Sequence, residues 1–547
     1  MIPVDAALIL LAAVVASAVC GRLVPGNVPL PLVQIGIGVI LAGVADLGVT
    51  LDPQVFFLLF LPPLLFRDGW RSSQEALWRD RGTILSLSLG LVVFTVAGVG
   101  FFIAWLIPAM PLPIAFALAA IVSPTDPLAV SAIAERVPVP TRLMRVLEGE
   151  SLLNDASGLV CMRFAVAAAL SGTFSLVDAL GTFAWLAVGG VTIGAATTWL
   201  VALGREWIAR RYGEDPGSTI VLSLLIPFGA SFMADMVGAS AVLAAVAAGV
   251  VMSIAEQRGT ALAITRVRRT AVWETVYFVA SGVVFILLGE QLPTIVDGAA
   301  TVVREAGHRE PIWLALYVFA ICLALALIRF IWVWASLRFV LYRMGRRSVG
   351  PQAPGWRVTA AMTVAGVRGA VTLAGIMTLP LTLTDGQPLP GRDLAIFLSA
   401  GIIIVLLIAA SLLLPVLLRD LRFPPEPSEQ AAEDEARIAA SKAALAALAS
   451  VQRTEIANSP EDANRIADSA ARLVTLYQQR IDALAKSATV RDEGHRGADV
   501  ERKLRLVSIR AERNEIYRRV RSRKLSEDAA RKLVREIDLL EARFGPE

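Results

Sequence analysis

Long apolar stretches alternate with short polar loops from about residue 4 to residue 418. Each stretch is close to the roughly 20 residues that a helix needs to cross the hydrocarbon core of a bilayer. The pattern predicts an all-α polytopic membrane protein with about thirteen membrane-spanning helices. The predicted spans lie near 4–21, 28–48, 51–66, 83–108, 112–134, 143–171, 178–202, 218–237, 240–256, 271–290, 311–337, 357–381 and 393–418.

Arginine in the loops gives the expected orientation, because loops rich in Lys and Arg stay on the cytoplasmic side. One set of alternate loops holds Arg22, Arg67, Arg71, Arg79, Arg81, Arg136, Arg142, Arg145, Arg205, Arg210, Arg211, Arg258, Arg266, Arg268, Arg269, Arg338, Arg343, Arg346 and Arg347. The opposite loops hold only Arg304, Arg309 and Arg392. We therefore expect an external N-terminus and a cytoplasmic C-terminus.

Composition agrees with a membrane protein and excludes several other classes. Of the 547 residues, 56% are hydrophobic, far above the usual share in a soluble domain. The net charge of +4 gives no indication of nucleic-acid binding, and two histidines leave little scope for histidine chemistry. The three cysteines are isolated in apolar segments, so we expect no disulfide framework and no metal site.

The fifth span is interrupted in its middle by Ser123, Pro124, Thr125, Asp126 and Pro127. Two prolines three residues apart cannot both keep a regular helix, because each lacks an amide hydrogen. The helix should break there and leave backbone carbonyls unpaired. Within a membrane such carbonyls are tolerated beside a cavity or with a partner, and a cation is a suitable partner.

The sixth span carries a second polar group at membrane depth. Ser151, Asn154 and Asp155 lie on or near one helical face, and Glu148 and Glu150 precede them. A carboxylate at this depth costs about 2.5–3.5 kcal/mol even on the lenient insertion scale. Several polar groups in one neighbourhood indicate an ion path; the alternative is that they only hold helices together.

At these positions the sequence resembles a known family, cation/proton antiporter family 1, the sodium/proton exchangers. The resemblance covers about residues 8–418 and rests on three ordered segments, TDP at 125–127, ESLLND at 150–155 and GVRGA at 366–370. A fourth segment, FLPPLLFRDGW at 60–70, is closest to the bacterial branch. The resemblance implies a secondary active transporter rather than an enzyme, without cofactor, in the cell (inner) membrane. It also implies a homodimer and a role in sodium transport and pH homeostasis.

The chemistry of the site follows from its oxygen atoms. Na+ and Li+ are hard cations, and a transport site needs one carboxylate with neutral oxygens around it. Asp155 can supply the charge, while Ser151, Thr125 and the freed carbonyls near Asp126 can supply neutral oxygens. By resemblance, Thr125, Ser151 and Asp155 are the ligands of the transported Na+, and Asn154 belongs to the same motif.

A second interrupted helix is expected in the twelfth span, where Gly366, Arg368 and Gly369 lie in mid-span. Transporters often contain two inverted repeats with broken helices in matching positions. We infer repeats over spans 1–6 and 8–13, with span 7 as a connector; alternatively, the glycines only permit close packing. Asp126 and Arg368 could neutralise the dipoles of the half-helices where spans 5 and 12 cross.

The resemblance assigns Glu150 a scaffold role, as the partner of Arg368 between spans 6 and 12. It also suggests an acidic residue near the site in the third span, for which Asp68 at the cytoplasmic mouth is the candidate on the ion path. Other charges in or near spans are as consistent with helix packing or the interface as with the path. These are Arg163, Arg329, Glu290, Glu274 and Asp235.

The composition becomes that of a soluble protein from Pro424, and every Lys lies at or after Lys442. We therefore expect a transmembrane exchanger domain over 1–422 and a cytoplasmic α-helical tail over 423–547. Ser459 and Pro460 predict a helix start, followed by an apolar face. That face comprises Ile466, Ala470, Leu473, Tyr477, Ile481 and Leu484, and a last helix has Leu533, Ile537, Leu540 and Phe544 on one face.

The leading hypothesis is exchange of Na+, or of Li+ or K+, for H+ by alternating access. Asp155 stands beside the amide of Asn154, so a single titrating carboxylate can hold one monovalent cation or one proton, and exchange should be electroneutral. One alternative is a K+-preferring exchanger. A remote alternative is an intramembrane aspartyl protease using Asp126 and Asp155, but the GxGD motif of that class is absent.

Overall fold

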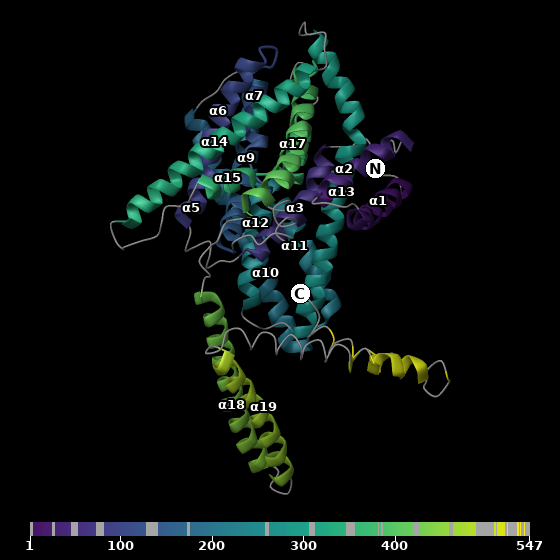
Figure 1. The fold of residues 1–547 in the computed structure, drawn as a ribbon, viewed down its shortest axis with the longest axis vertical. Helices are drawn as coiled ribbons and strands as arrows, with labels where there is room; N and C mark the ends of the chain where they lie inside the picture. Colours follow the sequence, from purple (N-terminus) through teal and green to yellow (C-terminus); the bar gives the residue numbers. More distant parts are fainter. Residues whose placement is uncertain are drawn as a thin grey trace. The chain divides into compact units, whose positions relative to one another are not determined.

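The computed structural model describes the chain as two compact units, Met1–Arg422 and Phe423–Glu547. The described residues are 4–23, 28–44, 53–72, 81–126, 141–171, 176–257, 262–305, 312–345, 356–380, 382–383, 387–418, 427–458 and 463–487, with short stretches between 508 and 541. Within these residues all regular secondary structure is helical, apart from one isolated β-bridge between Thr382 and Pro388. Figure 1 shows the helices in their order along the chain.

The first half of the first unit contains α1 (Val4–Leu23), α2 (Leu30–Val44), α3 (Pro53–Arg71), α5 (Arg81–Leu85), the π-helical turn η1 (Ser86–Gly90), α6 (Leu91–Leu106), α7 (Leu112–Val122), α9 (Thr141–Ser171) and α10 (Leu176–Tyr212). The second half contains α11 (Pro216–Met236), α12 (Ala241–Gln257), α13 (Ala263–Glu305), α14 (Ile312–Gly345), α15 (Trp356–Val364), α16 (Ala370–Met377) and α17 (Arg392–Leu418). The second unit contains α18 (Pro427–Asn458) and α19 (Ala463–Ser487).

The prediction of an all-helical polytopic membrane protein is confirmed. In the described part of the chain, seven helices are long and apolar enough to cross a membrane. Shorter apolar helices account for further predicted spans, such as α2, α7 and α12. Each of the thirteen predicted spans overlaps at least one helix, but the number that cross the bilayer stays a prediction.

Two helix pairs in the first unit approach so closely that their backbones touch. A Cβ atom on Gly38 of α2 would lie 2.1 Å from a backbone oxygen of α13, and one on Gly289 of α13 would lie 2.0 Å from a backbone oxygen of α2. Gly69 of α3 and Gly249 of α12 make the same reciprocal contact, at 2.5 Å and 2.1 Å. Such contacts stabilise membrane helices by close packing, because lipid provides no hydrophobic driving force between them.

The helix interruption predicted in the fifth span is present, since α7 ends at Val122 and residues 123–126 are not helical. The continuation of this span, residues 127–134, lies outside the described residues. The twelfth span is also interrupted: α15 ends at Val364, α16 begins at Ala370, and residues 365–369 between them are not helical. The end of α7 and the gap between α15 and α16 therefore lie where the sequence predicted helix interruptions.

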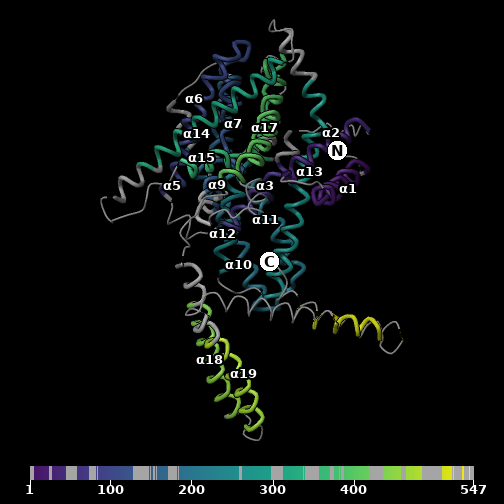
Figure 2. Tube along the Cα trace, in the orientation of Figure 1, coloured from purple at the N-terminus to yellow at the C-terminus, as the bar shows by residue number. Residues whose placement is uncertain are grey.

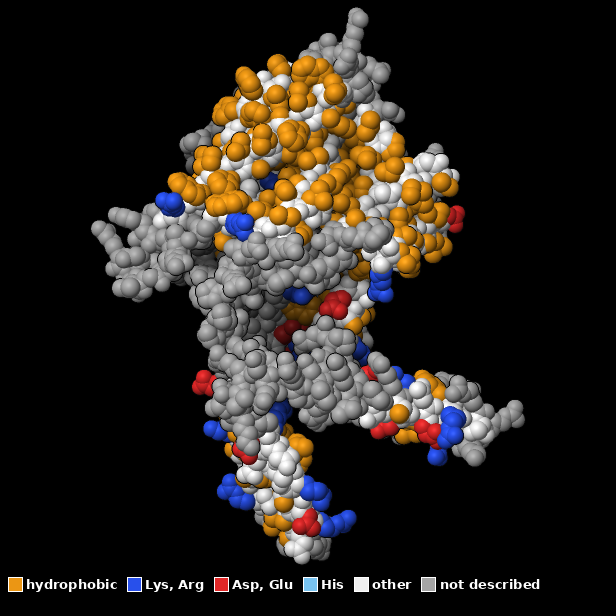
Figure 3. Space-filling view, viewed as in Figure 1, with side chains coloured by type: hydrophobic (Ala, Val, Ile, Leu, Met, Phe, Trp, Pro, Cys, Tyr) orange, Lys and Arg blue, Asp and Glu red, His pale blue; other side chains and the backbone are white. Residues whose placement is uncertain are grey.

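The surface of the first unit has the character expected for contact with acyl chains. Figure 3 shows a face covered almost entirely by hydrophobic side chains in the region of α6, α14 and α17. Exposed residues on these helices include Phe101 at 61% and Phe319 at 63%. A continuous apolar surface of this size would be unfavourable in water, so it agrees with a membrane location.

The second unit contains a helical hairpin in which α18 packs against α19 (Figure 2). Of the apolar positions predicted for α19, Ala470 is buried and Ile466, Tyr477 and Ile481 are partly buried, whereas Leu473 is 46% exposed and the side chain of Leu484 lies outside the described residues. Helix α18 was not predicted, because its alanine-rich sequence has no comparable apolar face. Ser459, Pro460, Leu540 and Phe544, on which other expectations for the tail rest, lie outside the described residues.

Candidate functional site

The two helix interruptions lie against each other at the centre of the first unit. The backbone N–H of Asp126 donates a hydrogen bond of 2.7 Å to the carbonyl oxygen of Val367. This bond joins the non-helical segment after α7 to the one between α15 and α16. Backbone groups freed by the two breaks thus partly satisfy each other, which is required inside a membrane.

Arg368 lies at the C-terminal end of α7. Its Nε donates to the carbonyl oxygen of Val122, the last residue of that helix, at 2.6 Å, and its Nη1 donates to the carbonyl oxygen of Gly366. Arg368 as a residue is 3% exposed. A cation at this position stabilises the negative end of the helix dipole and occupies an otherwise unpaired carbonyl.

Asp126 has the complementary position at the N-terminal end of α16. A Cβ atom on Gly369, the residue that precedes α16, would lie only 1.6 Å from Asp126 Oδ2. Only glycine leaves room for the carboxylate at this point. A carboxylate stabilises the positive end of a helix dipole, so Asp126 and Arg368 together place opposite charges at the two half-helix ends.

Thr125 connects the break to α9. Its hydroxyl donates to Glu150 Oε1 at 3.2 Å and accepts from Asn154 Nδ2 at 3.0 Å. Glu150 and Asn154 are one turn apart on α9, so both reach the same hydroxyl. All three side chains are buried, and the two bonds fix the position of Thr125 relative to α9.

The prediction that Glu150 pairs with Arg368 is wrong. Glu150 pairs with Arg329 of α14, whose Nη1 and Nη2 donate to its two carboxylate oxygens at 2.5 Å and 2.8 Å. The remaining Nε of Arg329 donates to the carbonyl oxygen of Met362, at 3.1 Å. Arg368 instead donates to carbonyl groups at the helix breaks, from Nε to Val122 and from Nη1 to Gly366.

Sequence reasoning noted Arg329 but did not assign it to the site. Its position within the eleventh span could have indicated a buried ion pair, because an unpaired guanidinium in a membrane is costly. It did not reveal the partner, because α9 and α14 are far apart in sequence. Glu150 and Arg329 are 1% and 2% exposed, and their two parallel bonds have the bidentate geometry typical of strong Arg–carboxylate pairs.

Asp155 is buried, at 6% exposure, yet it has no hydrogen-bond or ion-pair partner among the residues that the structure describes. Ser151, one turn earlier on the same helix, is also buried. In the same part of the chain, Asn154 Oδ1 and Ser123 Oγ are buried without a hydrogen-bond partner. Ser123 was noted in the sequence only as part of the break. These are oxygen atoms, the ligands that hard cations prefer.

Two further carboxylates act electrostatically on Asp155: Asp126 at the break and Asp68 near the end of α3. The structure therefore brings the candidate path residue Asp68 within electrostatic reach of Asp155. Two other charges noted in the sequence have different surroundings. Arg163 on α9 and Asp235 at the end of α11 are exposed on the isolated chain, and neither has an ion pair within the described ranges.

Comparisons with known proteins agree with this geometry. The family model "Sodium/hydrogen exchanger, transmembrane" matches residues 9–420. The chain is 36% identical over 533 residues to the uncharacterized Na+/H+ exchanger YjcE of Escherichia coli, covering 96% of each protein. It is 42% identical over 418 residues to a sodium, potassium, lithium and rubidium/H+ antiporter of Bacillus pumilus, covering 75% of this chain and 61% of that protein.

A solved structure shares the fold. The sodium proton antiporter MjNhaP1 of Methanocaldococcus jannaschii superposes with a TM-score of 0.58 at 18% sequence identity, covering 77% of this chain and 99% of that one. The family consists of secondary transporters without a cofactor, so the protease alternative is set aside. The family match and the relatives show that the chain belongs to the sodium/hydrogen exchanger family.

Proposed function

We propose that this protein exchanges Na+ for H+ across the cell membrane and that Asp155 binds the two ions in turn. The observation that carries the proposal is the pairing pattern on α9. Glu150 is neutralised by Arg329, whereas Asp155 is buried without a partner among the described residues. A buried carboxylate needs a proton or a cation, because an isolated charge is strongly disfavoured away from water.

Neutral oxygen atoms around Asp155 complete the proposed cation site. Ser151 lies one turn away on α9, and Asn154 Oδ1 is an unused acceptor. The hydroxyl proton of Thr125 is directed to Glu150, and one lone pair accepts from Asn154, so a second lone pair remains for a cation. Together with Asp126 these residues form the proposed ion-binding set. Glu150 and Arg368 are its scaffold, and Asp68 is on the proposed path.

The cation preference is proposed to include Li+ and K+ as well as Na+. A site of one carboxylate and neutral oxygens has no feature that restricts it to a single alkali cation. Two Bacillus relatives are named antiporters of sodium, potassium, lithium and rubidium, which favours this broad range. The names of the same two relatives also favour a second candidate function, an exchanger that prefers K+.

We propose that exchange is electroneutral. With Glu150 held by Arg329 and Asn154 uncharged, Asp155 is the buried carboxylate of α9 that is proposed to titrate; the side chain of Glu148, on the same helix, lies outside the described residues. One proton or one monovalent cation then neutralises it, so the loaded site carries the same charge in both halves of the cycle. Proteoliposomes clamped at different potentials with valinomycin test this point. An exchange rate or an equilibrium Na+ distribution that follows the potential contradicts it.

We also propose that α1–α9 and α11–α17 are two repeats joined by α10. Exchanging each span with the span seven positions later converts several of the closest helix pairs into other observed pairs. The pair α2–α13 becomes α12–α3, and α1–α13 becomes α11–α3, and all of these pairs are in contact. The broken helices of spans 5 and 12 exchange with each other. Such repeats would support alternating access around the crossing point.

Orientation, assembly and the extent of the tail are proposed from the sequence. The distribution of loop arginine favours an external N-terminus and a cytoplasmic C-terminus. A homodimer in the inner membrane is proposed from the family resemblance. We propose that residues 1–422 form the exchanger domain and that residues 423–547 form a cytoplasmic helical tail.

The direct test is cation-driven proton flux with the purified full-length chain in proteoliposomes. Imposed Na+, Li+ and K+ gradients should each be compared, at equal ionic strength, with a gradient of a large organic cation. Proton movement against Na+ supports the proposal, and its size with K+ decides between the two candidates. Absence of flux with every alkali cation, in protein shown to be folded, contradicts it.

A further inference from the structure

A second group of charged side chains, with Arg269 fully buried, lies where the ends of α10, α11, α12 and α13 meet, apart from the ion site. Several of its polar atoms are buried without a hydrogen-bond partner in the described residues: Arg205 Nη1, Arg269 Nε and Nη1, Thr265 Oγ1 and Glu214 Oε1. Buried polar groups in native proteins are almost always paired. Such a concentration of unpaired atoms indicates a missing ligand or ordered water.

Arg269 is the centre of this group and is fully buried. Its Nη2 lies against a carboxylate oxygen of Glu256, whose other oxygen accepts from Trp70 Nε1 at 2.7 Å. The Trp70 ring also lies 5.7 Å from the guanidinium carbon. One edge of Arg269 is therefore neutralised by α12 and α3, while its Nε and Nη1 are left without an acceptor.

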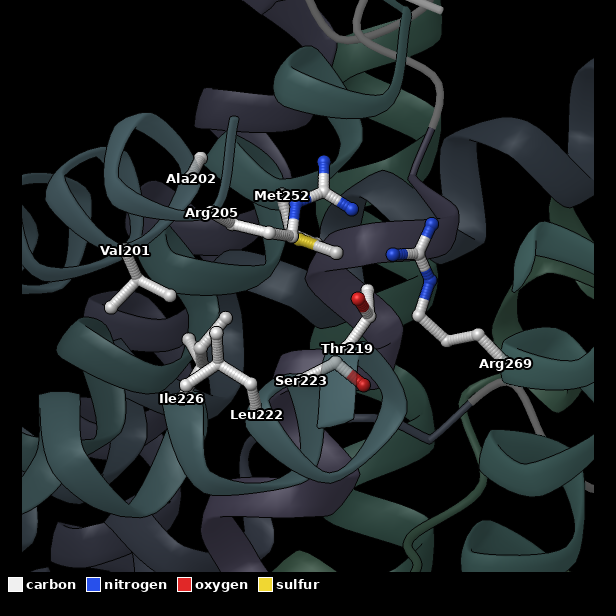
Figure 4. A pocket seen from close by; sticks show the side chains of 9 residues that line it. All are labelled: Val201, Ala202, Arg205, Thr219, Leu222, Ser223, Ile226, Met252 and Arg269. Atoms are coloured by element: carbon white, nitrogen blue, oxygen red, sulfur yellow. The ribbon is translucent and has the colours of Figure 1, made fainter. Parts of the chain in front are cut away.

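A small pocket opens beside these free donors, with room for about one water-sized group. Figure 4 shows the guanidinium groups of Arg205 from α10 and Arg269 from α13 entering it from opposite walls, with the hydroxyl groups of Thr219 and Ser223 on the α11 wall. Among the described residues the rest of the lining is apolar, and none of them contributes a carboxylate to it. Inside the pocket the fixed charge is therefore positive.

We propose that this pocket binds a small monovalent anion of the halide type, with chloride as the abundant example. Two guanidinium groups close to each other repel in a medium of low dielectric constant, and an anion between them removes that repulsion. A single weakly hydrated ion suits a wall that is part cationic and part apolar. The pocket is too small for a whole phosphate group.

The competing arrangement is a network without a ligand, in which Glu214 neutralises the arginines through water. Glu214 lies between α10 and α11 and accepts from the backbone N–H of Leu262, at 2.8 Å. Its other oxygen is unpaired, so a water bridge is chemically feasible. Among the described residues Glu214 does not line the pocket, however, so it contributes no carboxylate to the space between Arg205 and Arg269.

Thermal unfolding of the purified full-length protein tests the proposal, because a ligand that binds the folded state raises Tm with its concentration. Chloride replaces gluconate at constant ionic strength and cation content, and bromide is the second halide. The test variant is Arg205→Gln. The matched control is Arg210→Gln, on the same helix, where the guanidinium is 77% exposed and paired with Glu206.

We expect a saturable rise in Tm with chloride and bromide in the native protein and in Arg210→Gln, and its loss in Arg205→Gln. No halide-dependent rise, or an equal rise in Arg205→Gln, overturns the site. A rise with inorganic phosphate or phosphatidylglycerol vesicles but not with halide overturns the halide assignment. If Arg205→Gln does not fold, anomalous scattering from bromide-soaked crystals decides: a peak between Arg205 and Arg269 supports the site, and its absence overturns it.

Discussion

Two carboxylates on α9, Glu150 and Asp155, are less than two turns apart and are both buried, yet their surroundings differ completely. Glu150 accepts two hydrogen bonds from Arg329 and a third from Thr125. Asp155 has no such bond among the described residues, and its electrostatic neighbours, Asp126 and Asp68, are themselves acidic. The helix thus carries one neutralised and one unneutralised acid side by side.

The difference shows how a membrane transporter can use the same residue type for two purposes. Burying a charge is costly unless it is paired, and a paired charge is then costly to disturb. Glu150 is therefore suited to hold α9 to α14 throughout the cycle. Asp155 must acquire its partner from solution, and that partner can be a cation or a proton.

The largest effect is expected for Asp155→Asn. The amide keeps the shape of the side chain, but it carries no charge to bind a cation and has no carboxyl proton to release. Exchange in proteoliposomes should fall to the level of empty liposomes, while size-exclusion behaviour and thermal unfolding remain those of a folded protein. Asp235→Asn, at the exposed end of α11, is the matched control and should retain exchange. Normal flux in purified Asp155→Asn would remove the residue from the mechanism.

Gly369→Ala should also abolish or nearly abolish exchange, through geometry rather than charge. The new Cβ atom would lie 1.6 Å from Asp126 Oδ2 and 2.6 Å from Asp126 Cβ, so the two broken helices must move apart. Gly36→Ala on α2 is the control, because a Cβ there meets nothing within 4 Å. The readouts are flux and Tm. If Gly369→Ala retains both at native levels, the close approach of the two breaks is not needed.

A double-mutant cycle on Glu150 and Arg329 tests whether their ion pair stabilises the fold. Breaking a buried pair leaves one lone charge, so Glu150→Ala and Arg329→Ala should each reduce stability by about 3–5 kcal/mol. The double variant should be less damaging than the sum, with an interaction energy of about 0.5–3 kcal/mol. The same cycle on Glu150 and Arg368 should give the smaller interaction. A larger interaction energy for Glu150 and Arg368 than for Glu150 and Arg329 would support the Glu150–Arg368 pair that the family resemblance implied.

The sequence predicted the features that depend on local chemistry. Pro124 and Pro127 predicted the end of α7, and Gly366 and Gly369 predicted the gap between α15 and α16, because both motifs oppose a regular helix within an apolar run. Hydrophobic stretches of membrane-spanning length gave the positions of the helices. Thr125 and Asn154 meet through a hydrogen bond, in agreement with their placement in one predicted site.

What the sequence did not predict depends on pairing between distant helices. Arg329 and Glu150 are 179 residues apart, and either Arg329 or Arg368 could have satisfied the same carboxylate. The choice is made by backbone geometry, since the carbonyl groups of Val122 and Gly366 occupy Arg368. The cluster around Arg269 was missed for a related reason: its members looked like ordinary loop arginines that set orientation, although Arg269 is fully buried.

The smallest effect is expected at a third carboxylate, Asp215, which is exposed and has no arginine partner in the described part of the chain. It caps α11 by accepting from the backbone N–H groups of Ser218 at 2.8 Å and Gly217 at 3.4 Å. These bonds, chiefly the one from Ser218, lower the pKa of the Asp215 carboxyl below its usual value. A group with a lowered folded-state pKa stabilises the fold above its unfolded pKa, and this contribution is lost as the pH falls through the folded value.

Asp215→Ala should therefore lower Tm slightly at neutral pH, and the difference from the native protein should shrink below about pH 4, where the carboxylate becomes protonated. Exchange at neutral pH should be unchanged. Asp235→Ala, at the opposite end of the same helix, removes an acid from the negative end of the dipole and should not lower Tm. A loss of exchange in Asp215→Ala would show that an exposed carboxylate at a helix cap is coupled to the ion site. The contrast between Glu150 and Asp155 would then be too simple.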